Sequence, residues 1–214
     1  MEEFIYEIDN AERCVMTSVW AKDLRYKENL QKIPNDKPGW YRWWAPIKVL
    51  EKLRITPDYL EFLCKRKLKD EYFYCVYVGI AVKESIRARL NWHVNQRHRK
   101  SAVQSGTLST FRQSISSLVA EDQFDEDAAN QLIDMLIVEY CAMDYTIKSD
   151  EAKNEIECIE KEALSSKNSY VLPLNIQGNK NVVIKQYLTD LKKVRKISKI
   201  KNPNYQNICF SEKY

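Results

Sequence analysis

The chain has 214 residues, of which 44% are hydrophobic and 30% are charged, and its formal net charge is +4. This length allows one sizeable domain with a buried core, and the composition argues against a disordered or a membrane-spanning chain. Only four residues are glycine, where an average usage of about 7% would give roughly fifteen. The shortage of glycine excludes a glycine-rich phosphate-binding loop and a small β-sandwich full of tight turns.

Three segments rich in aromatic and β-branched residues predict strands, at 37–46, 71–81 and 135–145. Residues 47–68, between the first two, have the pattern of two short amphipathic helices separated at Thr56 and Pro57. Apolar residues at helical spacing predict the remaining helices. These are 83–98, 107–120, 125–134, 149–166 and about 180–200.

This order of elements predicts one α+β domain over residues 1–214, in which helices flank a small, central, three-stranded, mainly antiparallel sheet. The core is expected to run from about 37 to 178. A helical insertion at 47–70 separates the first two strands, and a basic extension with its own helix follows at 180–214.

Basic residues gather in two stretches of the chain. Residues 83–100 hold six Lys and Arg against one acid and include both histidines, while residues 180–203 hold eight against Asp190 alone. This asymmetry suits a polyanionic partner, although a solvated helix face gives the same pattern.

The six cysteines are scattered and form no CxxC pair, so we expect reduced, buried side chains and neither a disulfide framework nor a zinc site. The N-terminus has no basic stretch followed by an apolar one, and no run approaches 18 apolar residues. We therefore expect no membrane partner and a cytoplasmic or nucleoid-associated protein.

The candidate catalytic residues come from several of these elements. Tyr41 and Tyr77 lie on neighbouring predicted strands, each close to a glycine, and Arg89 and His93 share one helix face because they are four residues apart. Taken singly, such tyrosines are usually core residues and such a helix face is usually solvated.

One carboxylate stands out on the helix at 149–166. Glu160 lies inside the apolar stripe that Ile156, Ile159 and Ala163 mark, whereas Glu162 lies toward the flank. Burying a lone carboxylate is costly unless it is paired or binds a metal ion. Glu160 is therefore the preferred candidate for a metal ligand, with Glu162 as the alternative.

In chain order, these residues resemble the GIY-YIG nuclease family. The resemblance rests on Gly39-Trp40-Tyr41, Tyr77-Val78-Gly79, the RLNWH stretch at 89–93, a glutamate on a later helix, and Pro173-Leu174-Asn175. Trp40 replaces the usual aliphatic residue. The 35 residues between the two tyrosines make a wider gap than is usual, which implies an insertion and favours the restriction-endonuclease-like branch.

The resemblance implies a role for each matching residue. Tyr41 would be the general base with His93 as its hydrogen-bond partner, and Tyr77 would orient the water or the phosphate. Arg89 would bind the phosphate, and Asn175 would hold the end of the site in place by hydrogen bonds. Glu160, or less favourably Glu162, would hold one Mg²⁺ or Mn²⁺ ion per site.

The implied function is a metal-dependent DNA endonuclease of the restriction type that acts on double-stranded DNA. Cutting both strands of a symmetric site would favour a homodimer. A structure-specific repair or mobile-element nuclease, a catalytically silent nucleic-acid-binding module and a protein-interaction scaffold are the alternatives. Basic side chains outside the site are candidate phosphate contacts. They are Arg97, Arg99, Lys100, Arg112, Lys192, Lys193, Arg195 and Lys196.

Overall fold

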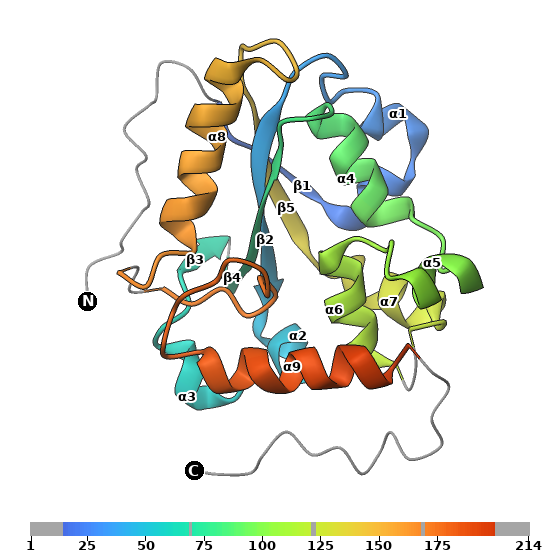
Figure 1. The fold of residues 1–214 in the computed structure, drawn as a ribbon, viewed down its shortest axis with the longest axis vertical. Helices are drawn as coiled ribbons and strands as arrows, with labels where there is room; N and C mark the ends of the chain where they lie inside the picture. The colour runs from blue at the N-terminus through green and yellow to red at the C-terminus, as the bar shows by residue number, and fades with distance from the viewer. Residues whose placement is uncertain (1–14, 69, 121–122, 168–169, 200–214) are drawn as a thin grey trace.

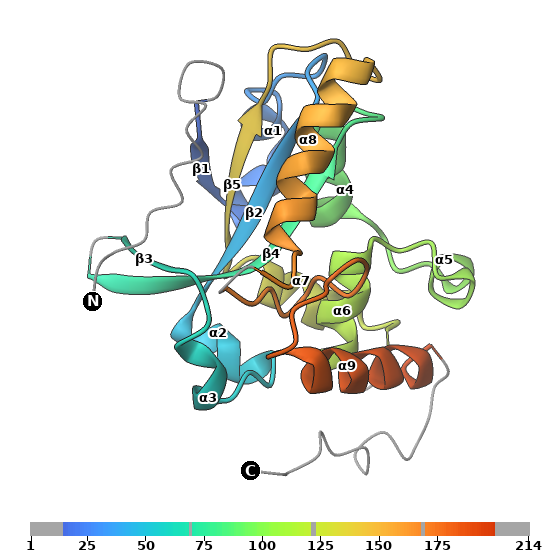
Figure 2. The same ribbon diagram turned by 60° about the vertical axis from the view of Figure 1, so that its left-hand side comes forward.

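The computed structural model describes residues 15–68, 70–120, 123–167 and 170–199, in which five antiparallel strands form one sheet with helices on both faces (Figures 1 and 2). The strand order is β1-β5-β2-β4-β3. The strands are β1 (Thr17–Trp20), β2 (Gly39–Pro46), β3 (Lys65–Leu68), β4 (Glu71–Ala81) and β5 (Ile137–Ala142).

The three predicted strands are present as β2, β4 and β5, which lie side by side in the sheet. The prediction of a three-stranded sheet is wrong because β1 and β3 add one strand at each edge. Both are four residues long, and β3 has the sequence KRKL. Short, charged strands are typical of sheet edges, where one side of the backbone needs no partner strand.

The helices predicted after β4 all occur, with slightly shorter bounds than expected. Those that the sequence pattern missed are single-turn or two-turn elements, too short for apolar periodicity to show. The helices are η1 (Ala21–Arg25, a 3₁₀ helix), α1 (Lys27–Leu30), α2 (Ile47–Lys52), α3 (Pro57–Leu60), α4 (Ile86–Asn95), α5 (Lys100–Ser105), α6 (Thr110–Val119), α7 (Glu126–Ile133), α8 (Asp150–Ala163) and α9 (Lys185–Ile197).

The segment between the two tyrosine strands is only partly helical. It holds α2 and α3 as expected, but its end forms β3, which pairs with β4. The predicted helical insertion at 47–70 therefore contributes a strand to the sheet as well as two short helices.

The side chains of β2 alternate between two different environments (Figure 2). Tyr41 and Trp43 face the core that α4 and α6 cover, while Trp40 packs with Ala152 and Ile156 of α8 on the opposite face. This alternation is the ordinary consequence of a strand covered by helices on both sides. It separates Tyr41 from a second polar cluster on the other face, which is also the face that α8, the helix of Glu160, covers.

Two glycines are required by close approaches within the sheet. A Cβ at Gly39 would lie 2.0 Å from the carbonyl oxygen of Cys141 on β5, and a Cβ at Gly79 would lie 2.3 Å from the Tyr41 hydroxyl. Because Gly79 lies directly opposite Tyr41 in the strand pairing, it leaves room for the phenol ring to lie across β4.

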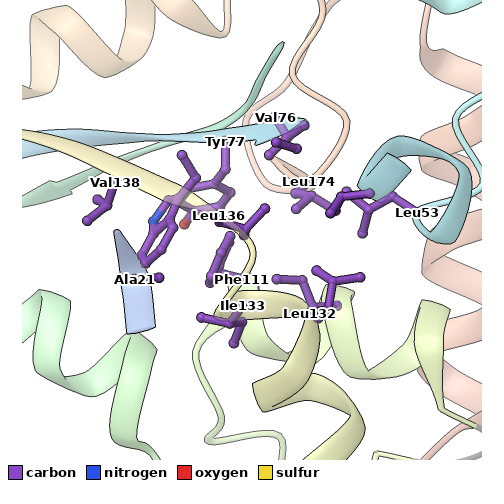
Figure 3. Packing of buried hydrophobic residues seen from close by; sticks show 14 of the residues in the cluster. Ala21, Leu53, Val76, Tyr77, Phe111, Leu132, Ile133, Leu136, Val138 and Leu174 are labelled. Carbon is purple, nitrogen blue, oxygen red and sulfur yellow. The ribbon is translucent and has the colours of Figure 1, made fainter. Parts of the chain in front are cut away.

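The main core lies between the sheet and the helices α4, α6 and α7. Figure 3 shows Tyr77 from the sheet, Phe111 from α6 and Leu174 converging there, with Leu132 and Ile133 of α7 below them. The rings of Tyr77 and Phe111 lie 5.2 Å apart. One wall of the candidate site is thus part of the hydrophobic core.

The cysteines differ from expectation in bonding and in burial. Cys141 is disulfide-bonded, so the prediction of reduced cysteines is wrong there. Cys64, Cys75 and Cys158 are free thiols, but only Cys75 is buried, while Cys64 is partly buried and Cys158 is exposed. Cys14 and Cys209 lie outside the described residues.

Within the described ranges, no helix is both long enough and apolar enough to cross a bilayer.

Candidate active site

A hydrogen-bonded pair of buried side chains forms the centre of the site. The Tyr41 hydroxyl on β2 and Nε2 of His93 on α4 are 2.5 Å apart, and the two residues are 1% and 2% exposed. Ser85 caps the N-terminus of α4 by accepting a hydrogen bond from the Ala88 amide at 3.1 Å. The cap fixes where the helix begins, and with it the position of His93 over the sheet.

Both members of this pair are neutral near pH 7. Burial raises the pKa of Tyr41 well above 10, with further increases from the neighbouring Tyr77 and Glu160. Burial also lowers the pKa of His93 well below 6.5, as do the charges of Arg89 and Arg112. Nδ1 of His93 lies 3.1 Å from the Ser109 hydroxyl, so the imidazole can donate there and accept the Tyr41 proton at Nε2.

Tyr77 connects this pair to the charged residues of the site. Its ring is stacked against that of Tyr41, with centroids 6.3 Å apart. Burial, followed by the charge of Glu160, raises the pKa of Tyr77 to about 12, while Arg89 and Arg195 act in the opposite direction. The phenol therefore lies within electrostatic reach of one carboxylate and two guanidinium groups.

Arg89 is held by an acidic partner, and its side chain is 25% exposed. Its Nη2 forms an ion pair with Glu84 at 2.7 Å, and its guanidinium lies 4.9 Å from the centre of the Trp92 ring. Its Nε is buried and has no hydrogen-bond partner within the described chain. An unsatisfied buried N–H is costly, so this guanidinium fits a site that completes its hydrogen bonds with a ligand.

Glu160 on α8 is a partly buried carboxylate for which the described residues provide no hydrogen bond or ion pair. Burial raises its pKa, as does the charge of Glu157, while Arg89 and Lys161 act in the opposite direction. An unpaired carboxylate oxygen suits a hard divalent cation. Because no group of three or more His, Cys, Asp or Glu in the described ranges could enclose an ion, the other ligands would be water and phosphate oxygens.

Glu162, the alternative ligand, is placed differently. It is exposed, and its carboxylate lies 3.4 Å from the Cys158 thiol on the same helix. No shift of the Tyr41 or Tyr77 pKa is attributed to Glu162, whereas Glu160 raises both. The geometry favours Glu160.

Asn175 holds the strand that carries Tyr77. Its side chain accepts a hydrogen bond from the Val78 amide at 2.9 Å and donates one to the Val78 carbonyl at 2.7 Å. The adjacent Leu174 amide donates to the Val76 carbonyl at 3.0 Å. These bonds occupy an edge of β4 that β3 does not reach, so Asn175 is a positioning residue for Tyr77.

The predicted DNA contacts fall into three groups. Most are exposed, namely Arg97, Arg99, Lys100, Lys192, Lys193 and Lys196. Two of these have acidic partners, because Arg97 pairs with Glu126 at 2.9 Å and Lys193 with Asp190 at 3.1 Å. Arg195 is partly buried and donates a hydrogen bond to Gln113, and Arg112 is fully buried.

Arg112 does not fit the prediction of a DNA contact. Its Nη1 donates to the carbonyls of His93 and Val94 at 2.9 and 3.0 Å, and its Nε donates to His98 at 2.9 Å. The guanidinium thus satisfies the carbonyls at the end of α4, behind the catalytic candidate His93. The sequence suggested an exposed arginine because serines surround it, but these serines are themselves buried in α6.

Two site residues were missed by the sequence reasoning. Ser109 is the N-cap of α6 as well as the partner of His93; a serine directly before a periodic apolar segment is a recognisable signal for the first role only. Gln113 accepts a hydrogen bond from Arg195, and no local pattern marks it.

A buried Tyr–His pair near a partly exposed arginine and an unpaired glutamate has the groups that phosphodiester hydrolysis requires: a base, a cation and a metal ligand. The model of the GIY-YIG catalytic domain matches residues 39–197, from β2 to α9, and the chain belongs to this family. The domain is a nuclease domain of the hydrolase class, and nucleases of the family depend in general on divalent metal ions and act on DNA. Searches of curated proteins and of solved structures found no match.

Proposed function

We propose that this protein is a Mg²⁺- or Mn²⁺-dependent endonuclease of the restriction type that hydrolyses phosphodiester bonds in double-stranded DNA. The observation that supports this most strongly is the hydrogen bond between Tyr41 and His93 beside Arg89 and Glu160. A core tyrosine would need none of these charged neighbours.

In the proposed reaction, Tyr41 is the general base. It takes a proton from the attacking water while its own hydroxyl proton passes to Nε2 of His93, so that no free phenolate forms. The resulting hydroxide attacks phosphorus, and the bond from phosphorus to the leaving oxygen breaks. His93 then carries the proton, and the Ser109 hydroxyl at Nδ1 keeps the ring oriented.

The remaining residues handle charge and position. Arg89, whose side chain is 25% exposed, donates to a non-bridging phosphate oxygen, and Tyr77 orients the water or the phosphate while Asn175 holds its strand. Glu160 would hold the cation, which when bound supplies positive charge to the phosphate and the leaving oxygen.

The restriction-type proposal rests on what surrounds the site. The chain inserts α2, α3 and β3 between the two tyrosine strands and adds α9 after Asn175. These elements, with the exposed residues Arg97, Arg99, Lys100, Lys192, Lys193 and Lys196, provide surfaces for contacting a duplex. Cutting both strands of a symmetric site would bring two copies together as a homodimer.

The test is incubation of mixed plasmid DNA with the protein, with and without Mg²⁺ or Mn²⁺, followed by sequencing of the ends. Discrete fragments support a restriction-type enzyme, cleavage confined to branched DNA supports a repair nuclease, and binding without cleavage supports a silent module. Glu160→Gln and Arg89→Ala should abolish cleavage. Glu157→Gln is the matched control, because Glu157 lies on the same helix and pairs with Lys161.

A further inference from the structure

The two-stranded ribbon of β3 and the first half of β4 projects from the body of the molecule (Figure 2). Within this ribbon Lys65 lies opposite Tyr74, and Lys67 lies opposite Tyr72. Directly opposite residues of an antiparallel pair share one face of the sheet, so these four side chains form one face, which we call the outer face. Tyr74 packs against the main core, and the other three side chains are exposed.

The opposite face of the ribbon anchors it to the rest of the sheet. Arg66 and Phe73 lie opposite each other there. Nη1 of Arg66 forms an ion pair with Glu139 at 2.5 Å. Phe73 is 2% exposed and lies edge-on to Trp20, with ring centroids 5.8 Å apart. Although the ribbon projects, its outer face is therefore held in one orientation.

The outer face combines positive charge with an exposed aromatic ring. Lys65 and Lys67 are both exposed, and no carboxylate in the described ranges forms an ion pair with either of them. Tyr72 is 47% exposed, and Nζ of Lys65 lies 5.5 Å from the centre of its ring. This contact orients the ammonium group without neutralising its charge, so the face remains open to an anionic partner.

Lysines on an edge strand also prevent edge-to-edge pairing with another sheet. That role requires the charges alone and leaves the exposed ring of Tyr72 unexplained. A nucleic acid accounts for both features, because lysines and tyrosine hydroxyls both donate to phosphate oxygens. A two-stranded ribbon is also one of the elements that the major groove of duplex DNA admits. Duplex DNA is therefore the partner that fits this face.

The ribbon lies close enough to the candidate active site for one duplex to contact both. Tyr72 and Tyr77 are five residues apart on β4, which is about 17 Å of extended strand. Half a helical turn of DNA has about the same length, roughly 17 Å. A duplex that presents a phosphate near Tyr77 is thus long enough to reach the ribbon.

We propose that the outer face of the β3–β4 ribbon is a DNA-docking surface, on which Lys65 and Lys67 pair with phosphates of a duplex and the Tyr72 hydroxyl donates to a phosphate oxygen. This inference rests on the proposed nuclease function. Because phosphate contacts carry no sequence information, the ribbon holds the duplex and does not select the cleavage site.

The first test measures how the binding of duplex DNA depends on salt. Lys65→Gln/Lys67→Gln is compared with the wild type by fluorescence anisotropy of a labelled duplex, over a series of KCl concentrations and without divalent ions. Each phosphate contact contributes about 0.9 to the slope of log K against log[salt], so the double variant should lose about 1.8. Lys27→Gln/Lys32→Gln, at two exposed lysines in and just after α1, is the matched control and should keep the slope. An equal change in both double variants would overturn the proposal.

Binding and cleavage together separate this proposal from the proposed function. If the wild type binds duplex DNA through the ribbon but never cuts it in Mg²⁺ or Mn²⁺, only the nuclease function fails. If the wild type cuts DNA while Lys65→Gln/Lys67→Gln keeps its slope and KM, only the docking surface fails. Ribbon-dependent binding of RNA without binding of duplex DNA would also overturn the proposal. Urea unfolding midpoints close to that of the wild type confirm that the variants fold.

The second test separates the tyrosine from the lysines. Tyr72→Phe keeps the ring beside Lys65 but removes the hydroxyl. Loss of this hydrogen bond should weaken duplex binding by about two- to tenfold at fixed salt, whereas the slope should stay the same because no charge is lost. Tyr26→Phe is the control, at a tyrosine next to α1 that is 60% exposed. Equal affinities of the two variants would overturn the phosphate contact of Tyr72.

Discussion

Two polar clusters, each including side chains of β2, treat buried charge in opposite ways. We call them the Glu139 cluster, formed by Ser18, Arg42, Trp44, Arg66 and Glu139, and the Tyr41 site, formed by Tyr41, Tyr77, Arg89, His93 and Glu160. Each contains one carboxylate and at least one arginine. In the Glu139 cluster every charge has a partner, and in the Tyr41 site the carboxylate has none within the described chain.

Glu139 is almost completely satisfied. It is 5% exposed, accepts hydrogen bonds from Arg42 and from Arg66 at 2.5 Å, and accepts a third from the Trp44 indole at 3.2 Å. Both guanidinium groups also lie over the Trp44 ring, 5.1 and 4.7 Å from its centre. Burial alone would raise the pKa of Glu139, but Arg42 and Arg66 lower it below the ordinary value.

The pKa of Glu160 is shifted in the opposite direction to that of Glu139. Burial and the charge of Glu157 raise it, and Arg89 offsets this only in part. The contrast teaches how to separate a structural carboxylate from a functional one. A paired carboxylate has both oxygens occupied and is costly to disrupt, whereas an unpaired, partly buried carboxylate keeps its oxygens available at a cost in stability.

The largest effect is expected from the hydroxyl at the centre of the Tyr41 site. Tyr41→Phe should keep the packed ring but remove the proposed general base, so cleavage should fall by about 10²- to 10⁴-fold. The measurement is the rate of plasmid cleavage in Mg²⁺. Tyr140→Phe is the control, because Tyr140 lies opposite Tyr41 on β5 and is also buried. Equal rates for the two variants would remove Tyr41 from the chemistry.

The next effect concerns the free energy of unfolding, and it tests the contrast between Glu139 and Glu160. Glu139→Gln leaves two arginines without a counter-charge and should reduce the free energy of unfolding by about 2–4 kcal/mol, below the full range for buried pairs because both arginines keep some solvent contact. Glu160→Gln should leave stability unchanged or higher in the absence of metal ions. Urea unfolding measures both. A larger loss for Glu160→Gln would reverse the assignment of structural and functional roles.

The sequence was informative where a residue's role follows from its own element. The aromatic runs of β2 and β4 place Tyr41 and Tyr77 on neighbouring strands, and an acid inside an apolar helical stripe points to Glu160. These signals are local, because the period of a strand or a helix determines which face a side chain takes.

The sequence failed where the role depends on how elements pack. Arg112 and Arg195 both look like exposed basic residues, yet Arg112 caps α4 and Arg195 turns toward Gln113. For Arg195 a signal was present, since Leu188, Leu191 and Arg195 follow helical spacing on one face. β3 was missed because an edge strand of three consecutive basic residues and one leucine lacks the apolar pattern of a central strand.

A smaller effect tests whether the unpaired carboxylate binds a cation. A ligand that binds only the folded protein raises the free energy of unfolding by about 1.4 kcal/mol at ten times its dissociation constant. Mg²⁺ should therefore stabilise the wild type and the control Glu157→Gln, but not Glu160→Gln, in urea unfolding. Equal stabilisation of all three proteins would mean that the ion binds elsewhere.

The smallest effect, the pH dependence of stability, has opposite signs at the two carboxylates. Glu160 holds its proton more tightly in the folded protein than in the unfolded chain, because its pKa is raised. Its contribution to stability is therefore full below the ordinary value of 4.5 and is lost as the pH rises through the folded pKa. Glu139 has a lowered pKa, so its contribution is present above 4.5 and is lost as the pH falls through the folded pKa.

Comparison with the matching glutamine variants isolates these two contributions, since buried His93 titrates in the wild type and in both variants. In urea unfolding without metal ions, the stability of the wild type relative to Glu160→Gln should decrease as the pH rises above 4.5. Relative to Glu139→Gln it should increase from acid pH toward 4.5 and then level off. If both differences changed in the same direction, the two carboxylates would share one kind of environment, and the contrast between a paired and an unpaired charge would be wrong.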